Sequence, residues 1–397
     1  MPDTQISRRA LLSGLSLLTL SACSMGSFDF GDFGGPTNPP DNGQNLPLAQ
    51  GQTFGNGPVR VAMLLPLTGD ASAVGASMSG GAQLAMEFIA GNTNIQDNIT
   101  LVVKDTGASA QGAAQAAQQA VSEGASLILG PLKADQVTAA GSIARAAGIQ
   151  LIGFSNNSGA AQPGVYLLNV LPESETKRSL GYAKTLGKRA FAGIFPNTSF
   201  GRIQQGAFTQ AAADLGLRVV GVYSFGSEAE ARDVVAQIAP TLQAGQVDTL
   251  FLPDRATAPS FGVLLEEAKI AGGPIQIIGS ADWNGDQAIA STPYLAGALF
   301  PAVDDTGYQA LLPTYSQKFG ATPHPFVTIA YTSVILANVS SLSMGTPRYD
   351  RSLLTAPGGF NGRDGVFRFL ADGRSEYALV MKRVTVGGSQ LVDGARI

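Results

Sequence analysis

Short apolar segments alternate with longer segments of helical periodicity along most of the chain, and this alternation limits the fold more than any other feature. The apolar runs have the length of buried strands, and residues between them, such as Val74, Met78 and Ala85, recur at helical spacing. The expected strands are 59–65, 99–103, 126–130, 150–154, 190–195, 218–223, 249–252 and 275–278. Strands that alternate with helices predict parallel sheets with helices on both faces, so we expect an α/β fold.

The beginning of the chain predicts an exported, lipid-anchored protein. Residues 1–22 carry Arg8-Arg9 followed by a short apolar stretch, which is typical of a signal peptide. Leu20-Ser21-Ala22-Cys23 resembles the bacterial lipobox, and Cys23 is the only cysteine of the chain, so we expect it to be lipidated. An ordinary signal peptide with an incidental cysteine is the alternative. The arginine pair leaves open whether export follows the general or the twin-arginine route.

Residues 23–57 predict a disordered tether. They are rich in Gly and Pro and contain no Lys or Arg, so they cannot bury enough apolar surface to fold. Ser24, rather than Asp, follows the cysteine, and by resemblance to enterobacterial sorting this favours the outer membrane. We therefore expect the folded part to lie in the periplasm, tethered to the outer membrane through its lipid.

The composition excludes several classes of function. The net charge is −4, whereas a nucleic-acid binder normally shows a basic patch. One histidine and one cysteine cannot form a Cys/His zinc site, and one cysteine cannot form an intrachain disulfide. No apolar run is long enough to cross a bilayer.

Motifs of catalysis are missing from the sequence as well. It contains no nucleophile elbow, no phosphate-binding loop and no zinc-protease motif. His324 lies between two prolines, which is typical of a surface loop, and the acid pairs Asp304-Asp305 and Glu173/Glu175 are expected as solvated residues or at helix starts. We therefore expect a protein that is not an enzyme and uses no cofactor or metal.

Polar loops follow the predicted strands in both halves of the chain and form the candidate binding site. Parallel sheets bind ligands at the carboxyl ends of their strands, so such loops are expected to face a cleft, although each alone could be an ordinary turn. Hydroxyl, amide and N–H groups can hold an anion, and an acid from the opposite lobe can pair with a cation. Trp283, the only tryptophan, is expected either to stack on a ligand or to pack between lobes. The candidate residues are Thr68, Gly69, Asp70, Leu132, Ser155, Asn156, Asn157, Phe200, Asp254, Asp282 and Trp283.

Several segments resemble type I periplasmic solute-binding proteins of the leucine/isoleucine/valine-binding family. The resemblance begins at Pro58, and its marks are VRVAMLLPLTGDASAVGASMSGGAQLAMEFI, VVKDTGASAQGAAQAAQQAVSEGASLILGP, AGIQLIGFSNNS and FPNTSFGRIQQGAFTQAAADLG. It implies two doubly wound parallel-sheet lobes, joined by a three-crossing hinge, that close on a ligand. On this basis we expect an N-terminal lobe of 58–170 plus 301–345 and a C-terminal lobe of 171–300 plus 346–397, with apolar segments at 165–170 and 296–301 serving as crossings.

The amino-acid site of that family carries over only in part. Where the family holds the ligand carboxylate with a serine, this chain has Ala134, and Asn157 stands at a threonine position. Ser155 matches a backbone contact and Phe200 an aromatic position. The acid that binds the ligand ammonium has no aligned counterpart, although Asp282 is one residue away.

A narrower likeness is to the lipoprotein branch of penicillin-binding protein activators. The segments that carry it are LLPLTGD, GPLKADQVTAA, FSNN, PGVYLLNVLPESETKR and FPNTSFGR. This likeness implies an outer-membrane lipoprotein that contacts a peptidoglycan synthase. The sequence thus leaves two non-catalytic functions open. One is a lipoprotein that binds a small ligand such as an amino acid, with an ABC permease as partner. The other is a regulator of peptidoglycan synthesis, and neither involves nucleic acid.

Overall fold

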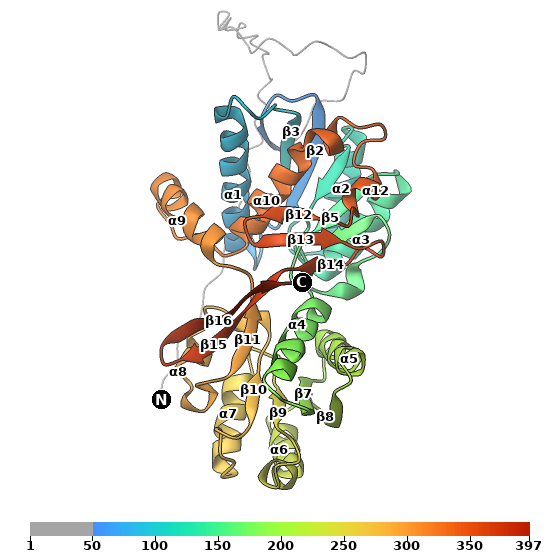
Figure 1. Cartoon of the computed structure of the whole chain (residues 1–397). Coiled ribbons are helices and arrows are strands. Elements are labelled where there is room, and N and C mark those ends of the chain that lie inside the picture. Colours follow the sequence, from blue (N-terminus) through green and yellow to red (C-terminus); the bar gives the residue numbers. More distant parts are fainter. Residues whose placement is uncertain (1–50) are drawn as a thin grey trace, which may run out of the picture. The chain divides into compact units, whose positions relative to one another are not determined.

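The computed structural model describes residues 51–397, in which helices flank two sheets made mainly of parallel strands (Figure 1). The first sheet has the strand order β1-β3-β2-β4-β5-β6. Its strands pair in parallel, except that β1 runs antiparallel to β3. The bounds are β1 (Gln52–Phe54), β2 (Val59–Leu65), β3 (Ile99–Asp105), β4 (Leu127–Leu129), β5 (Gln150–Gly153) and β6 (Val165–Leu167).

Helices α1 (Ser72–Gly91), α2 (Ala110–Ser122) and α3 (Ala134–Ala146) connect these strands, and the short helix η1 (Ser158–Ala160) follows β5. The strands read as continuous apolar runs because helices cover both faces of the sheet, and in β2 every residue but one is buried. Polar residues before the helices fix where they begin. The hydroxyl of Ser109, for example, accepts the Gly112 N–H at 3.1 Å and caps α2.

The second sheet has the strand order β16-β15-β11-β10-β9-β7-β8. Strands β7 to β11 pair in parallel, and the β15–β16 hairpin adds two antiparallel strands beside β11. The strand bounds are β7 (Ala190–Pro196), β8 (Arg218–Phe225), β9 (Thr249–Phe251), β10 (Gln276–Ile278), β11 (Leu299–Ala302), β15 (Leu379–Thr385) and β16 (Gly388–Arg396). The helices are α4 (Pro172–Thr185), α5 (Ser199–Asp214), α6 (Glu228–Gln243), α7 (Ala258–Glu267), η2 (Ala281–Trp283), α8 (Gln287–Ser291) and η3 (Pro293–Leu295).

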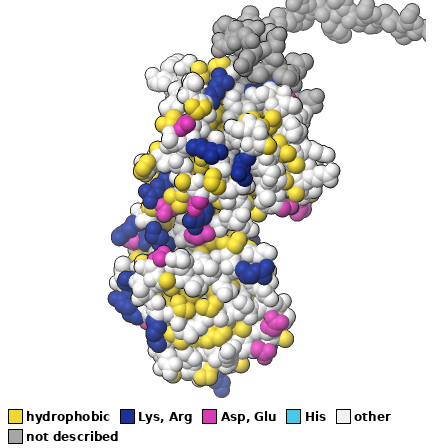
Figure 2. Space-filling view, turned by 90° about the vertical axis from the view of Figure 1, so that its right-hand side faces the viewer, with side chains coloured by type: hydrophobic (Ala, Val, Ile, Leu, Met, Phe, Trp, Pro, Cys, Tyr) yellow, Lys and Arg dark blue, Asp and Glu magenta, His cyan; other side chains and the backbone are white. Residues whose placement is uncertain are grey.

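The chain passes between the two lobes three times, after β6, after β11 and between β14 (Ser375–Tyr377) and β15. The segments expected as the first two crossings are themselves the strands β6 and β11, and the chain crosses directly after each. Figure 2 shows charged side chains of both signs near the narrowing between the lobes. Two ion pairs join α4 to β14 and the residue before it across this junction, Glu173 with Arg374 at 3.7 Å and Lys177 with Glu376 at 3.8 Å.

A third, small sheet of β12 (Phe360–Gly362), β13 (Gly365–Phe369) and β14 belongs to the first lobe. We expected residues 346–397 in the C-terminal lobe, but only the β15–β16 hairpin lies there. The reason is aromatic packing: Phe367 stacks on Tyr377 with ring centroids 5.4 Å apart, and both side chains lie in the first hydrophobic core.

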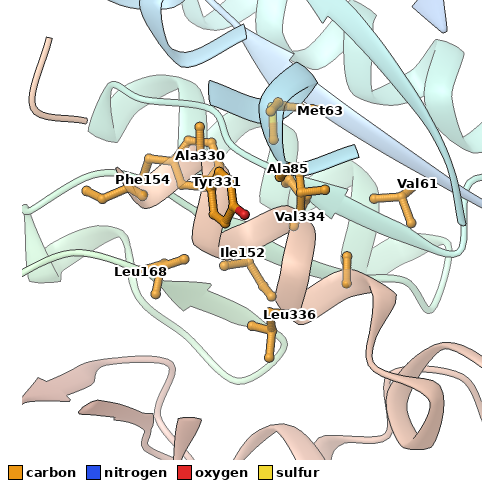
Figure 3. Close-up of a cluster of buried hydrophobic side chains, with 14 of the residues drawn as sticks. Val61, Met63, Ala85, Ile152, Phe154, Leu168, Ala330, Tyr331, Val334 and Leu336 are labelled. Carbon is orange, nitrogen blue, oxygen red and sulfur yellow. The ribbon is translucent and has the colours of Figure 1, made fainter. Parts of the chain in front are cut away.

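Helix α10 (Val327–Asn338) is buried on nearly all sides because the first lobe encloses it. Figure 3 shows its residues Ala330 and Val334 among side chains of the first sheet such as Met63 and Ile152. Helix α9 (Thr306–Phe319) precedes α10, and both contact α1. The short helices α11 (Ser340–Ser343) and α12 (Arg351–Leu354) lead to the small sheet.

The predicted signal peptide, Cys23 and most of the predicted tether lie outside the described residues. The last part of that tether, however, is ordered rather than disordered. Strand β1 pairs with β3, and the Gly57 N–H donates to the Ile99 carbonyl at 3.2 Å. Phe54 packs on the first core, which supplies the apolar burial that a Gly-rich composition does not indicate. Within residues 51–397, no helix combines the length and apolarity that a bilayer crossing requires.

Candidate functional site

A cavity of about 670 Å³ lies between the two lobes. Its wall includes residues from the loops that follow β4, β5, β7, β9 and β10, together with the crossing after β11. These loops leave the carboxyl ends of parallel strands, where open α/β sheets bind ligands. Loops from both sheets therefore meet at one cavity of a size suited to a small molecule.

Four of the predicted site residues line this cavity. Leu132 and Asn156 reach it from the first lobe, and Phe200 and Asp282 reach it from the second. Each follows a different strand, so these four positions come together only through the fold. Together they provide two apolar side chains, an amide that can donate or accept hydrogen bonds, and a carboxylate.

The three predicted residues of the loop after β2 do not line the cavity. The Thr68 hydroxyl donates to the Asp105 carboxylate at 2.6 Å, and Asp70 forms an ion pair with Lys133 at 2.8 Å. Gly69 has a φ of 86°, a conformation that a turn requires and that favours glycine. The polar groups of this loop are thus engaged with neighbouring loops of the same lobe.

The other predicted residues outside the cavity act as local caps or pack in a core. The Ser155 hydroxyl accepts the Asn157 N–H at 3.1 Å, and the Asn157 amide oxygen accepts the Gly159 N–H at 3.0 Å at the start of η1. Asp254 accepts the Thr257 N–H at 3.1 Å. Trp283 is buried against Phe300 in the core of the second lobe, so it neither faces the cavity nor packs between the lobes.

Glu175 is a buried acid of the cavity wall, although we expected it to be solvated or at a helix start. It lies in the first turn of α4 with 6% of its surface exposed, and its Oε2 accepts the Ala281 N–H at 2.7 Å. Burial raises the pKa of this carboxyl to about 8, and the nearby charge of Asp282 adds to the effect.

Asp282 lies next to this bond on the same loop and is accessible from the cavity. The side chain is exposed, yet the neighbouring protein reduces its hydration and raises the pKa of this carboxyl, while the charge of Arg255 opposes the rise. Arg255 itself also lines the cavity, but its guanidinium pairs with Asp286 at 3.0 Å.

Asp364 and Tyr377 reach the cavity from the small sheet, in the segment that we had assigned to the other lobe. Asp364 is 8% exposed, and burial raises its pKa to about 6. Contact with the Thr328 hydroxyl opposes this rise, but that hydroxyl also donates to the Pro325 carbonyl at 2.8 Å. The charge of Asp305 raises the pKa further. Tyr377 is 3% exposed, and no hydrogen bond joins its hydroxyl to another residue in the described part of the chain.

The acid pair Asp304-Asp305 and His324 also line the cavity. Asp304 accepts the Thr306 N–H at 2.8 Å near the start of α9, and Asp305 pairs with Lys382. His324 is half-buried rather than in a free surface loop, its Nδ1 accepts the Phe326 N–H at 3.2 Å, and burial lowers its pKa. The neutral form is therefore favoured near pH 7.

Among the described residues of the lining, His324 makes only local contacts: its N–H donates to the Ser77 hydroxyl at 2.7 Å, and its Nδ1 accepts the Phe326 N–H. Among residues 51–397, no three His, Cys, Asp or Glu side chains are placed to hold a metal ion. What the cavity offers is a mixture of aromatic rings, amides and carboxylates, which is typical of a ligand pocket.

Several solved structures of other proteins share this fold. A putative branched-chain amino acid ABC transporter from Rhodospirillum rubrum aligns with a TM-score of 0.71 and 20% identity, over 84% of this chain and 99% of that one. An ABC transporter substrate-binding protein from Desulfitobacterium hafniense in complex with Leu gives 0.65 and 18%, over 84% and 99%. A solute-binding protein of an ABC transporter from R. palustris in complex with benzoate gives 0.61 and 16%, over 86% and 98%.

At these identities the solved structures show a shared fold of two α/β lobes, as the sequence predicted. No curated protein sequence matches the chain at a significant level. The model of a family described as periplasmic binding protein matches residues 58–338, which is most of the chain. The chain therefore belongs to the periplasmic binding protein family.

Proposed function

We propose that this protein is a non-catalytic solute-binding lipoprotein that closes its two lobes on a small ligand such as an amino acid. The observation that carries this proposal is the interlobe cavity, which is lined by loops at the carboxyl ends of strands in both sheets. Because three chain crossings join the lobes, a hinge motion can bring both walls onto a ligand without disturbing either core.

The ligands bound in similar solved structures support this function. One holds Leu and another benzoate, so the same fold accommodates small ligands of different chemistry in those proteins. In this chain Asn156 and Phe200 stand on opposite walls of the cavity, where an amide and an aromatic ring can orient and cover a ligand.

The proposed location is the periplasmic face of the outer membrane. The lipobox-like segment that ends at Cys23, and Ser24 after it, support a lipid anchor there. Labelling with a radioactive fatty acid tests this location: wild-type protein should incorporate label, and Cys23→Ser should not.

A thermal-shift screen tests ligand binding. Purified protein is heated with amino acids, organic acids and amines, and a ligand at 100 times its Kd should stabilise the folded state by about 2.7 kcal/mol. Phe200→Ala should reduce that shift, whereas Phe88→Ala, an exposed aromatic outside the cavity, should leave it unchanged. A melting temperature that no compound of this panel changes would contradict the proposal.

The sequence likeness to penicillin-binding protein activators supports a second function, regulation of a peptidoglycan synthase. Its most extended segment, residues 163–178, spans β6, the first crossing and the start of α4, and so includes Glu175. Affinity capture from solubilised membranes separates the two functions. Recovery of a peptidoglycan synthase would select the regulator, and recovery of ABC permease subunits would select the transport partner.

A further inference from the structure

The charges that line the interlobe cavity are strongly unbalanced. Five carboxylates line it, Glu175, Asp282, Asp304, Asp305 and Asp364. Arg255 is the only Lys or Arg in the same lining, and its guanidinium is paired with Asp286 outside it. Among the described residues, the cavity lining therefore has an excess of acidic groups and no uncommitted Lys or Arg for an anionic ligand group.

Three of these acidic groups have no ion-pair partner among the described residues. Asp305 pairs with Lys382, whereas Glu175, Asp282 and Asp364 form no ion pair with any residue in 51–397. Glu175 and Asp282 face the cavity from the second lobe, and Asp364 faces it from the first. Near pH 7 Glu175 keeps its proton and Asp282 is exposed, whereas Asp364 is a buried carboxylate, and a charge that is buried without a partner costs free energy that a bound cation would offset.

A second, independent feature points to a ligand at the same place. The Tyr377 side chain is 3% exposed and lines the cavity, and its hydroxyl has no hydrogen-bond partner among the described residues, although the hydroxyl of a buried tyrosine normally finds one. Tyr377 lies close enough to Asp364 for that charge to raise the tyrosine pKa. A ligand N–H group between them could donate to both oxygens.

Aromatic side chains complete the wall. Phe200, Tyr308 and Phe326 line the cavity together with the carboxylates. The faces of such rings attract organic cations, and their apolar surface can cover the carbon skeleton between charged groups. A carboxylate on the ligand would, in contrast, lie among like charges.

From this lining we infer that the cavity binds a small organic amine: a cationic ligand that has no carboxylate, whose ammonium groups pair with Asp282 and Asp364 from opposite lobes. The inference rests on the proposed solute-binding function and narrows its ligand class from amino acids to amines.

Isothermal titration of the purified full chain tests this inference with matched probes. 1,5-Diaminopentane is the amine probe, and leucinamide and leucine form a pair of nearly equal shape in which only leucine has a carboxylate. Benzoate is the anionic probe. We expect the diamine to bind and leucinamide to bind at least tenfold more tightly than leucine, with no binding of benzoate.

Charge-removing variants locate the site. Asp282→Asn and Asp364→Asn should each weaken diamine binding at least tenfold. Asp233→Asn, the same change at an exposed position of α6, should leave it unchanged. Circular dichroism confirms that each variant is folded, and the double variant provides a second measurement if one single variant does not fold.

The outcomes separate this inference from the proposed function. Binding of leucine or benzoate without binding of either amine would overturn the amine inference and leave the solute-binding function standing. Amine binding that neither Asp282→Asn nor Asp364→Asn weakens would overturn the assigned site. Binding of none of the four probes would overturn the inference, and the wider thermal-shift panel would then decide the proposed function.

Discussion

At the scale of single residues, the buried carboxyl of Glu175 makes the stability of the fold depend on pH. Its pKa is about 8 in the folded protein, against an ordinary value of 4.5. The folded state therefore keeps a proton that the unfolded chain has already released in this range. Stability from this group is complete below about pH 4.5, falls as pH rises, and is lost above about pH 8, with a slope of up to about 1.4 kcal/mol per pH unit.

Replacement of Glu175 by Gln should remove that dependence. The Gln amide oxygen can still accept the Ala281 N–H but does not titrate, so the variant should gain stability over wild type as pH rises from 5 to 8. Urea unfolding at pH 5, 6.5 and 8 measures this difference. Glu266→Gln, on the exposed face of α7, should follow wild type at each pH. Parallel profiles for wild type and Glu175→Gln would show that the carboxyl does not carry the shift.

The sequence predicted only some of the residues that line the cavity, because a polar side chain that follows a strand can face a ligand or form hydrogen bonds within its own loop. Asn156 and Asp282 were found because a polar residue after a buried strand is placed at the ligand-binding edge. Asn157 and Asp254 follow strands in the same way, yet their oxygens accept N–H groups of their own loops. Asp364 is in a turn with no such signal, because its approach to the cavity depends on long-range packing.

At the scale of elements, the contact between α1 and α10 depends on the absence of a side chain. A Cβ built on Gly81 would lie 2.6 Å from the Val327 carbonyl oxygen, which is backbone and cannot rotate away. Gly81→Ala should force the two helices apart and reduce the free energy of unfolding by about 1–3 kcal/mol. Chemical denaturation measures this loss.

The same helix offers its own control. A Cβ on Gly91, the last residue of α1, meets no atom within 4 Å, so Gly91→Ala should be neutral or stabilise the helix by up to about 1 kcal/mol. Equal destabilisation by both substitutions would mean that the effect arises from helix propensity or the unfolded state and not from the α1–α10 contact.

The strands and helices themselves were mostly predictable, because two periodicities decide them. Segments such as 59–65 and 190–195 are buried on both faces and read as uninterrupted apolar runs. The short β1 was missed because Gly-rich flanking sequence is typical of disorder, and its order comes from pairing with β3. The local sequence therefore shows which segments are buried strands, but it does not show that a short segment pairs with a distant strand.

At the scale of the whole molecule, the likeness to known proteins predicted two lobes and a hinge of three crossings, but the residues alone did not place residues 346–378 in the first lobe. Burial of Phe367 and Tyr377 in that core decides it, and a strand that alternates apolar and polar residues can pair in either sheet. The chain changes lobe at Ala378, between β14 and β15, where no change of composition marks the boundary.

The hinge itself is held together by a buried serine, and this gives the last prediction. The Ser375 hydroxyl, 2% exposed, donates to the Asn169 carbonyl at 2.7 Å and so joins the third crossing to the first. The Ser174 hydroxyl donates to the Ser375 carbonyl at 3.0 Å from α4 in the other lobe. Ser375→Ala leaves a buried carbonyl without this donor, so we expect a loss of about 1–3 kcal/mol in unfolding free energy.

Ser375 does not line the cavity, so any effect of Ser375→Ala on ligand affinity must come through the relative position of the lobes. The cavity side chains are the same in this variant, so weaker binding would show that the crossings hold the two walls in position before the ligand binds. A hinge that is not held in this way must become ordered when the lobes close, and that ordering reduces the binding free energy. Ser142→Ala removes a hydroxyl from an exposed position of α3 and should alter neither quantity. If Ser375→Ala lowers stability but leaves the ligand Kd unchanged, the hydroxyl stabilises the first lobe alone, and the two walls are positioned by the remaining contacts between the lobes, such as the Ser174–Ser375 bond and the pair of Lys177 with Glu376.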